Sequence, residues 1–429
     1  MRKYLTGRAT AIGNRDMGVR VTIIGGGVVG LTTAYAMVRQ GIEVSVIDAC
    51  TELATETSYA NGGQLSYRYV APLADSGVPL QAIGWMLRKN SPLKLRPRLD
   101  LHQWRWMFDF LMACRGSVNQ NSAQLLLALA MESRVELNKW RTEDSLDDFG
   151  WRSNGKLVVF RNSSSFSQSR ANLMDPASQQ VVSGEELDIL EPSLTGKGFT
   201  GGIFTPDEEV GDCYEFCQGL VRKLQASGLC TFLLGQTVKS FRIMDNRIVA
   251  AKCDGYEHAV DQLVLCTGYR TAKLSIPKLE TPIYPLKGYS LTLPVESPHA
   301  APEISITDYD QKIVYARLKD KLRIAAMVDI VGYDPSIDAH RIKSLRSAAK
   351  EMFPNGGNYE KAVEWAGIRP ATPTGVPIVG KNETYNNLWL NIGHGALGFT
   401  LACGSASRIA RTMLSGARVT LEPTRANIF

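Results

Sequence analysis

The chain has 429 residues, of which 44% are hydrophobic and 21% charged, as in globular proteins with more than one domain. The net charge of +6 is small and the basic residues are spread along the chain, which argues against nucleic acid as a partner. No apolar run approaches the roughly 20 residues that cross a bilayer, and residues 1–18 lack the apolar segment of a secretory signal. We therefore expect a cytoplasmic protein.

The eight cysteines are scattered along the chain. None forms a CxxC pair, and none lies near a histidine at the spacing of zinc ligands. The cysteine pattern therefore predicts free thiols in a reducing compartment and no metal site.

The first folded segment reads as strand, helix and strand. Residues 19–24 form an apolar, β-branched run that predicts a buried strand. In "LTTAYAMVRQG", Leu31, Ala34 and Tyr35 share one helical face, and Gly41 is suited to end the helix. "EVSVID" predicts the second strand. The order is that of a βαβ unit.

Three glycines between the first strand and the helix predict a dinucleotide site. Gly25 permits the tight turn, Gly27 lets the backbone approach a pyrophosphate, and Gly30 lets the helix pack close to the strand. The helix N-terminus then faces the negative charge. Asp48 ends the second strand, where an acid accepts hydrogen bonds from a ribose and disfavours the 2′-phosphate of NADP. The cofactor-contacting positions predicted in this unit are Ile24, Gly25, Gly27, Val28, Val29, Gly30, Asp48 and Ala49.

The choice between NAD and FAD depends on the later segments. An NAD domain normally continues its βαβ units without a break, whereas here a polar loop, "ETSYANGGQLS", and a helical region from about 78 to 141 follow. Strand-plus-glycine signals recur much later, in "LVLCTG" and "LNIGHG". A longer dinucleotide would use such distant pieces, which favours FAD.

After Pro282 the periodicity changes to that of an antiparallel sheet. "YSLTLPV" alternates with period two, and "KIVYARL" and "KLRIAAMVDI" predict strands joined by a hairpin at Lys319 and Asp320. The fold class predicted is α/β, with a Rossmann-like FAD-binding domain built from discontinuous segments and an inserted α+β substrate domain built on the antiparallel sheet. The predicted boundaries are an extension at 1–18 that we expect to be disordered; FAD-binding segments at 19–150 (with a helical insertion), 206–281 and 363–429; and substrate-domain segments at 151–205 and 282–362.

Five stretches carry a resemblance to a known family: "TIIGGGVVGLTTAY", "TSYANGGQLSYRYVAP", "YPLKGYSLT", "GIRPATPTGVPIVG" and "LWLNIGHGALGFTLACGS". In this combination and order they resemble the FAD-dependent D-amino-acid oxidase and glycine oxidase superfamily, and within it the bacterial D-amino-acid dehydrogenases. The resemblance implies non-covalent FAD and oxidation of a D-amino acid to an imino acid, which hydrolyses to a 2-oxo acid and ammonia. In the dehydrogenases electrons leave to a quinone, in the oxidases to oxygen.

The resemblance also implies further cofactor contacts outside the βαβ unit. The loop beside the flavin corresponds to "TSYANGG", the adenine strand to "TVKSF", and the start of the last helix has N–H groups suited to stabilise an anionic reduced flavin. The residues implied are Ser58, Asn61, Gly62, Gly63, Val238, Thr267, Gly268, Gly393, His394, Gly395, Leu397 and Gly398.

Arg369 and Tyr289 are the candidate catalytic residues. Arg369 matches the family arginine that pairs with the substrate carboxylate, where a planar guanidinium makes two parallel hydrogen bonds. It could instead be a structural arginine before Pro370. Tyr289 could bond the same carboxylate or belong to the core. The mechanism we expect is hydride transfer from Cα to flavin N5, which needs no strong base if the amine binds neutral.

Two rival functions remain open from the sequence. One is a related dehydrogenase or oxidase acting on D-hydroxyproline, D-proline, glycine or sarcosine. The other is a subunit that holds FAD for electron transfer without oxidising an amine.

The composition of a stretch from Trp85 to Arg115 would suit a peripheral contact with the inner face of the cytoplasmic membrane. Basic residues lie beside aromatic ones, as at membrane surfaces; they are Arg88, Lys89, Lys94, Arg96, Arg98 and Arg105 beside Trp85, Trp104, Trp106 and Phe108. The alternative is that these aromatic residues form a helical core and the charges its solvated face.

Overall fold

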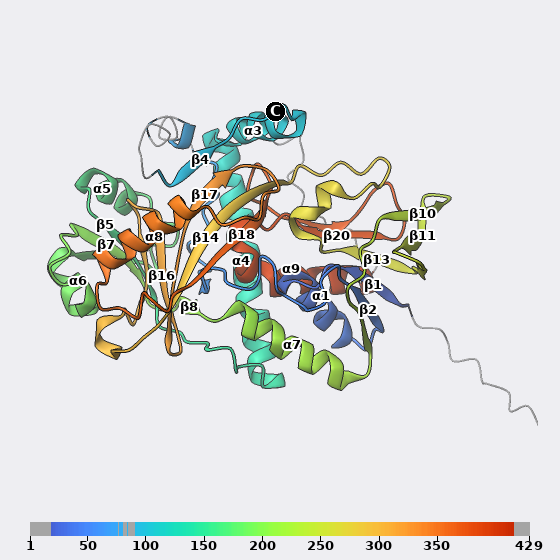
Figure 1. The fold of residues 1–429 in the computed structure, drawn as a ribbon, viewed down its shortest axis with the longest axis horizontal. Helices are drawn as coiled ribbons and strands as arrows, with labels where there is room; N and C mark the ends of the chain where they lie inside the picture. Colours follow the sequence, from blue (N-terminus) through green and yellow to red (C-terminus); the bar gives the residue numbers. More distant parts are fainter. Residues whose placement is uncertain (1–18, 76, 80–83, 85–90, 416–429) are drawn as a thin grey trace, which may run out of the picture.

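The computed structural model describes residues 19–75, 77–79, 84 and 91–415. The predicted extension at 1–18 lies outside this part of the chain. Two layers of β-structure lie next to each other, one built on parallel and one on antiparallel strands (Figure 1).

A six-stranded sheet forms the first layer, in the order β19-β20-β13-β1-β2-β9. All neighbouring strands are parallel except β19 and β20. Its strands come from distant parts of the chain: β1 (Val21–Ile24), β2 (Val44–Ile47), β9 (Cys230–Leu233), β13 (Gln262–Leu265), β19 (Ile378–Lys381) and β20 (Leu388–Ile392).

Helices cover one face of this sheet and a small second sheet covers the other. The helices are α1 (Val28–Val38), α4 (Gly116–Asp144), α7 (Cys213–Ser227) and α9 (Gly398–Ser415). The small sheet contains β10 (Ser240–Met244), β11 (Arg247–Lys252) and β12 (Glu257–Ala259). Because α1 lies between the sheet, α7 and α9, it is buried nearly all round rather than on one face.

The second layer is a nine-stranded sheet with the order β18-β14-β17-β16-β15-β5-β7-β6, and β4 pairs with β17. Its strands are β4 (Leu93–Leu95), β5 (Lys156–Phe160), β6 (Gln180–Ser183), β7 (Gly201–Thr205), β14 (Tyr284–Pro294), β15 (Ser305–Asp308), β16 (Ile313–Leu318), β17 (Lys321–Ile330) and β18 (Val363–Ala371). Helix α8 (Ala339–Met352) packs on one face through Ile342, Leu345, Ala349 and Met352.

The remaining elements are short or lie at the edges of the layers. They are α3 (Leu101–Ala113), α5 (Ser163–Ala171), α6 (Gly184–Leu190), the two-stranded sheet of β3 (Gln64–Leu65) and β8 (Glu209–Val210), and the 3-10 turns η1 (Pro192–Leu194), η2 (Gly268–Lys273), η3 (Pro298–Ala300) and η4 (Gly395–Leu397).

The predicted fold class is confirmed, since discontinuous segments build the parallel layer and an antiparallel sheet builds the other. Two segments differ from the predicted domain boundaries. Strand β18 pairs with β14, and β4 pairs with β17, so both belong to the antiparallel layer although they fall within predicted FAD-binding segments. The sequence of β18 does not alternate between apolar and polar residues, and the strand lies at the edge of the sheet, where Pro370 is tolerated.

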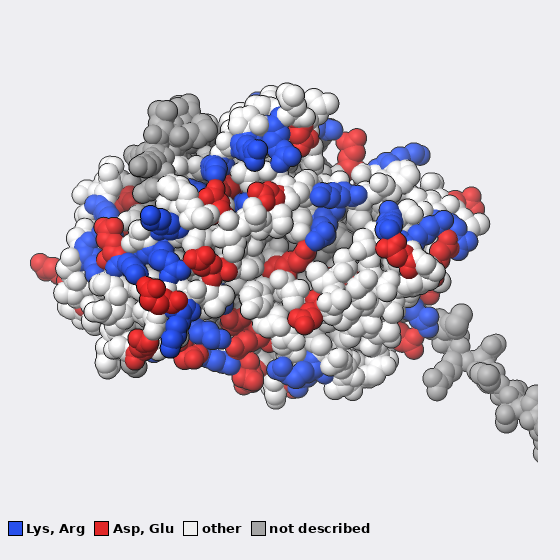
Figure 2. All heavy atoms as spheres, viewed as in Figure 1, with Lys and Arg blue, Asp and Glu red and all other residues white. Residues whose placement is uncertain are grey.

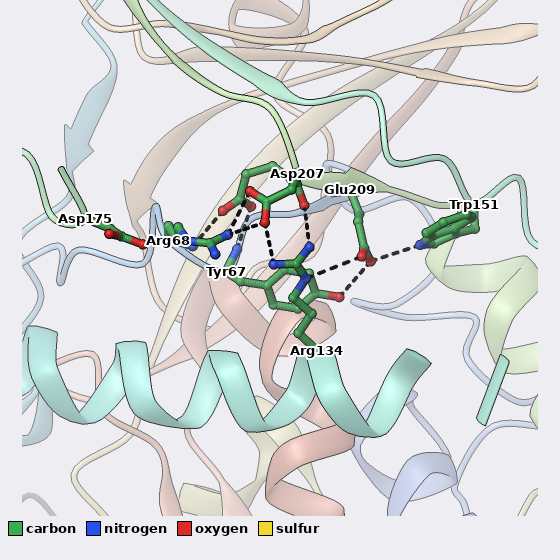
Figure 3. Close-up of polar contacts among 8 residues, drawn as sticks. Tyr67, Arg68, Arg134, Trp151, Asp175, Asp207 and Glu209 are labelled. Carbon is green, nitrogen blue, oxygen red and sulfur yellow. Dashed lines mark hydrogen bonds and ion pairs between the residues drawn. The ribbon is translucent and has the colours of Figure 1, made fainter. Parts of the chain in front are cut away.

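A cluster of charged and aromatic side chains joins the loop at 56–66 to helix α4 and strand β8 (Figure 3). The labelled members are Tyr67, Arg68, Arg134, Trp151, Asp175, Asp207 and Glu209. Arg134 donates to Asp207 at 2.7 Å and lies 3.7 Å from Glu209. Glu209, which is nearly buried, also accepts hydrogen bonds from the Tyr67 hydroxyl and the Trp151 indole. These contacts hold in place the chain segment that directly follows the loop at 56–66.

Replacing Glu209 by Ala should lower the free energy of unfolding by about 3 kcal/mol, because the buried Tyr67 hydroxyl and the partly buried Trp151 indole lose their acceptor and Arg134 loses a carboxylate. Urea unfolding measures the change. The control is Glu303→Ala, since Glu303 is 59% exposed and pairs with Arg152 and Arg317; it should cost about 1 kcal/mol or less. Equal losses in the two variants would contradict this role for the cluster.

Candidate active site

The carboxyl ends of β1, β2, β13 and β20 meet at one edge of the parallel sheet and open into a crevice. Most predicted cofactor residues line it: Ile24, Gly25, Gly27, Val28, Val29, Asp48, Ala49, Ser58, Val238, Thr267, Gly268, Gly393, His394, Gly395 and Gly398. Residues separated by more than 370 positions therefore share one site.

The other predicted cofactor residues do not line the crevice; they are Gly30, Asn61, Gly62, Gly63 and Leu397. The Asn61 side chain accepts the N–H of Gly63, and its carbonyl accepts from Arg323. Gly62 packs near Val314 of the antiparallel sheet. The end of the 56–66 loop thus lies against that sheet, while its beginning, at Ser58, lines the crevice.

Several lining residues were missed by sequence reasoning. They include Glu52, Thr55, Glu56, Thr57, Gln236, Thr237, Arg270, Pro370 and Asn391. Some directly adjoin predicted motifs, so a wider window around Asp48 and Val238 would have included them. Arg270 is different, because it reaches Glu56 across the crevice through a contact that only the tertiary fold creates.

A different physical reason accounts for the presence of glycine at each of the three positions at the start of α1. Gly25 has φ +108°, and a Cβ there would lie 2.4 Å from the carbonyl oxygen of Cys266. A Cβ at Gly30 would lie 1.8 Å from the carbonyl oxygen of Gly25. At Gly27 a Cβ would meet only the Ser58 hydroxyl, at 3.3 Å. Protein packing thus leaves room beside Gly27, at the helix N-terminus, where a pyrophosphate would fit.

Two polar side chains in the crevice bear on cofactor binding. Asp48 accepts the backbone N–H of Gly26 at 2.5 Å and of Cys50 at 2.7 Å, which stabilises the turn and leaves each oxygen a further lone pair. Buried Asn391 donates to the Thr33 hydroxyl, while its Oδ1 has no partner within the described residues. An acceptor in this position fits a hydroxyl or N–H donor of a bound dinucleotide.

His394 lies where β20 leads into the last helix. It is 2% exposed, and its Nε2 lies 3.1 Å from the Ser405 hydroxyl. Burial lowers its pKa to about 3, so the ring is neutral at ordinary pH. A buried imidazole with so low a pKa is a weak base, so its position next to Gly393 and Gly395 suits a contact to a flavin better than general-base catalysis.

Arg369 lies on β18, at the edge of the crevice. The next residue, Pro370, lines the crevice, and the carbonyl of the preceding Ile368 accepts a hydrogen bond from Thr57. The Arg369 guanidinium donates from Nη1 to the carbonyl of Met327 at 2.8 Å. No carboxylate pairs with it in the part of the chain that the structure describes. Burial lowers the pKa of Arg369, and the Asp329 carboxylate acts in the opposite direction.

Tyr289 does not lie with Arg369. Its side chain is 1% exposed and packs in the core beneath α8, on the other face of the antiparallel sheet. Its hydroxyl donates to Asp329 at 3.0 Å, and burial raises its pKa. Of the two positions that the sequence left open for Tyr289, the structure places it in the core. Its side chain does not reach the crevice.

The space beside Gly27 leads to a prediction about the cofactor. Gly27→Val should leave a folded protein with little bound FAD, because the side chain would occupy the place of the pyrophosphate. Gly30→Ala should destabilise the fold itself, because its Cβ collides with backbone. Circular dichroism and the flavin released on denaturation separate the two effects. Full FAD content in folded Gly27→Val protein would contradict this assignment.

Residues 20–412 match the sequence profile of one protein family, DAO, which is described as "FAD dependent oxidoreductase". D-amino acid dehydrogenase 2 of Pseudomonas aeruginosa is 58% identical over 394 residues, covering 92% of this chain and 94% of that protein. D-amino acid dehydrogenase 2 of Ralstonia nicotianae is 39% identical over 407 residues, covering 91% of this chain and 96% of that protein.

Solved structures share the fold at low identity. Glycine oxidase from Bacillus cereus has a TM-score of 0.71 at 18% identity, covering 93% of this chain and 96% of that one. L-proline dehydrogenase from P. horikoshii has a TM-score of 0.71 at 15% identity, covering 94% of each chain. The glycine-rich crevice, the discontinuous parallel sheet and the family match together lead to one assignment. The chain belongs to the DAO family of FAD-dependent oxidoreductases.

Proposed function

We propose that this FAD-dependent oxidoreductase dehydrogenates D-amino acids and passes the electrons to a quinone. The observation that carries the proposal is the partly buried Arg369 beside the cofactor crevice, which has no carboxylate partner within the described residues. An amino acid supplies the missing carboxylate. The D-amino acid dehydrogenases that this chain resembles over more than nine-tenths of its length support the same substrate class.

The residues of the chain orient the substrate. FAD, when bound, would supply the acceptor for the hydride that leaves Cα, while a proton leaves the nitrogen and the Cα–N single bond becomes the C=N bond of the imino acid. Arg369 fixes the carboxylate through two parallel hydrogen bonds, which limits rotation and holds Cα at one distance from the crevice. The imino acid then takes up water and releases ammonia, leaving the 2-oxo acid.

His394, whose pKa burial lowers to about 3, is too weak a base to take a proton from the ammonium group of an amino acid near neutral pH. We therefore expect the amino group to bind in its neutral form, so that no side chain has to remove its proton. Rising pH should favour binding until the free amine is fully deprotonated, and the positive charge of Arg369 should persist over that range.

Anaerobic mixing of the FAD-loaded protein with single amino acids tests the reaction. The panel is the D and L forms of alanine, phenylalanine, arginine and proline, with glycine, sarcosine and D-hydroxyproline. The D-amino acids should bleach the flavin absorption and the L forms should not. Reduction only by glycine, sarcosine or the cyclic amines would favour the related amine dehydrogenase. No reduction by any of them would favour an electron-transfer subunit. Faster reoxidation of the reduced flavin by a short-chain ubiquinone than by oxygen would support a quinone as the electron acceptor.

Arg369→Lys keeps the charge and loses the two-pronged geometry. The kcat/KM for the best D-amino acid should fall by about 1.5–3 kcal/mol in transition-state stabilisation, mainly through KM. FAD content should stay at the wild-type level. Steady-state kinetics with an artificial acceptor measures the effect, and unchanged kinetics in Arg369→Ala would remove Arg369 from the substrate site.

We further propose that α3 contacts an anionic membrane surface. The structure contains no helix, within the residues it describes, that is long and apolar enough to span a bilayer. A surface contact instead needs exposed apolar side chains on one side of an element. α3 has such a stripe, formed by Leu101, Trp104, Phe108 and Leu111.

The exposure of this stripe argues against the view that all these aromatic residues form a helical core. Trp104 is 47% and Phe108 53% exposed, whereas Trp106 is buried and donates its indole N–H to the carbonyl of Ala371. Trp106 therefore anchors the helix and does not take part in the contact. Arg88, Lys89 and Trp85 lie outside the described residues.

Basic side chains lie next to the stripe. Arg96, Arg98 and Arg105 are exposed, and Figure 2 shows blue side chains beside the mostly white crest at the top of the view, where α3 lies. Apolar side chains flanked by positive charges suit a bilayer with anionic headgroups. The contact would place the protein at the inner face of the cytoplasmic membrane, where a quinone is available.

Co-sedimentation with phosphatidylglycerol vesicles tests this surface. Wild type should pellet at low salt and remain in the supernatant at high salt, since each basic residue contributes about 1 kcal/mol. Trp104→Ser with Phe108→Ser should abolish pelleting. The matched control is Val135→Ser with Ile189→Ser, at apolar residues exposed on α4 and α6. Wild type that stays in the supernatant at low salt, or equal losses in both double variants, would contradict the proposal.

A further inference from the structure

Gly288 on β14 makes room for the Arg369 guanidinium. A Cβ at Gly288 would lie 2.2 Å from Nη2 and 2.4 Å from Cζ of Arg369. No side chain fits at these distances, so the guanidinium lies directly over the Gly288 backbone. Any larger residue would have to displace the charged group by more than an ångström, which is ample to spoil a two-pronged hydrogen bond.

Met327 supplies the only hydrogen bond that the guanidinium makes within the described residues. The pairing of β14 with β17 shifts between Lys287 and Tyr289, where two residues of β17, Met327 and Val328, lie opposite Gly288. This is a β-bulge, and Met327 has φ +72°. Bulges with a residue in this conformation usually have glycine there, and a methionine is strained. The strained backbone aims the Met327 carbonyl at Arg369.

The carboxylate of Asp329 acts on the charge of Arg369 but is already hydrogen-bonded to other residues. Asp329 accepts from the Tyr289 hydroxyl at 3.0 Å and from Arg341 at 2.6 Å. Both oxygens are engaged by the α8 side of the sheet, and Asp329 is 1% exposed. It therefore cannot turn to neutralise Arg369. This also explains the buried position of Tyr289, which helps to hold Asp329 away from the substrate arginine.

We propose that Gly288 and Met327 are positioning residues that hold Arg369 flat against β14 with its remaining N–H groups free for the substrate carboxylate. Glycine at position 288 leaves no side chain under the guanidinium, and the bulge turns the Met327 carbonyl towards Nη1. The inference rests on the proposed role of Arg369 and extends it to two residues that do not themselves touch the substrate.

The test uses FAD-loaded protein and two readouts. The first is binding of propionate, a carboxylate without an amine, followed by the change it causes in the flavin spectrum. The second is flavin reduction by the D-amino acid of the panel that reduces wild type fastest, compared with the amide of that amino acid. Gly288→Ala should weaken propionate binding roughly tenfold or more, the loss expected when one charge-assisted hydrogen bond fails. It should also raise KM for the amino acid much more than for its amide.

Met327 gives a second pair of variants that does not depend on Gly288→Ala folding. Met327→Asn should bind propionate much more tightly than Met327→Val, because asparagine tolerates positive φ and a β-branched residue does not. Gly116→Ala is the control for a glycine substitution, since a Cβ there meets nothing within 4 Å; it should bind propionate as wild type does.

The outcomes separate this inference from the proposed function. If no amino acid reduces wild type but Gly288→Ala still weakens propionate binding, the dehydrogenase proposal fails and the positioning role stands. Equal propionate binding in wild type, Gly288→Ala and Met327→Val would overturn the positioning role, as would wild type that binds no propionate. Equal rises in KM for the acid and the amide would mean a general disturbance of the sheet and would overturn it as well.

Discussion

Arg369 carries a positive charge on a partly buried guanidinium, whose one hydrogen bond within the described residues is to a neutral backbone carbonyl. Removing such a charge from water costs several kcal/mol unless an opposite charge compensates. The Asp329 carboxylate favours this charge from a distance but does not pair with it, because Tyr289 and Arg341 occupy its oxygens. The unpaired guanidinium therefore makes the site complementary to a small carboxylate, and the surrounding strands are arranged to keep it so.

The two layers meet around this charge. The parallel sheet gathers the glycine turn, Asp48 and the start of the last helix at one edge, which is where a dinucleotide binds. Strand β18 belongs to the antiparallel sheet, yet Pro370 lines the same crevice and Thr57 bonds the carbonyl of Ile368. One strand thus fixes the distance between the cofactor crevice and Arg369, the proposed substrate anchor, so that orientation would be built into the fold rather than created on binding.

Local patterns predicted the parts that depend on neighbours in sequence. The glycine spacing with Asp48 predicted the crevice edge, and the alternating runs on either side of Lys319 and Asp320 predicted the hairpin of β16 and β17. Tyr289 shows the limit, because alternation in a strand predicts two faces without saying which one meets the substrate. The bulge at Met327 and the contact of Arg270 with Glu56 arise from strand pairing and long-range packing, which no local pattern encodes.

A crystal structure of the FAD-loaded protein with bound propionate tests the central claim most directly. The account predicts that both propionate oxygens lie within hydrogen-bonding distance of the Arg369 guanidinium, that this group still contacts the Met327 carbonyl, and that Asp329 keeps its bonds to Tyr289 and Arg341. A structure in which Arg369 pairs with Asp329, and the propionate lies elsewhere in the crevice, would contradict it.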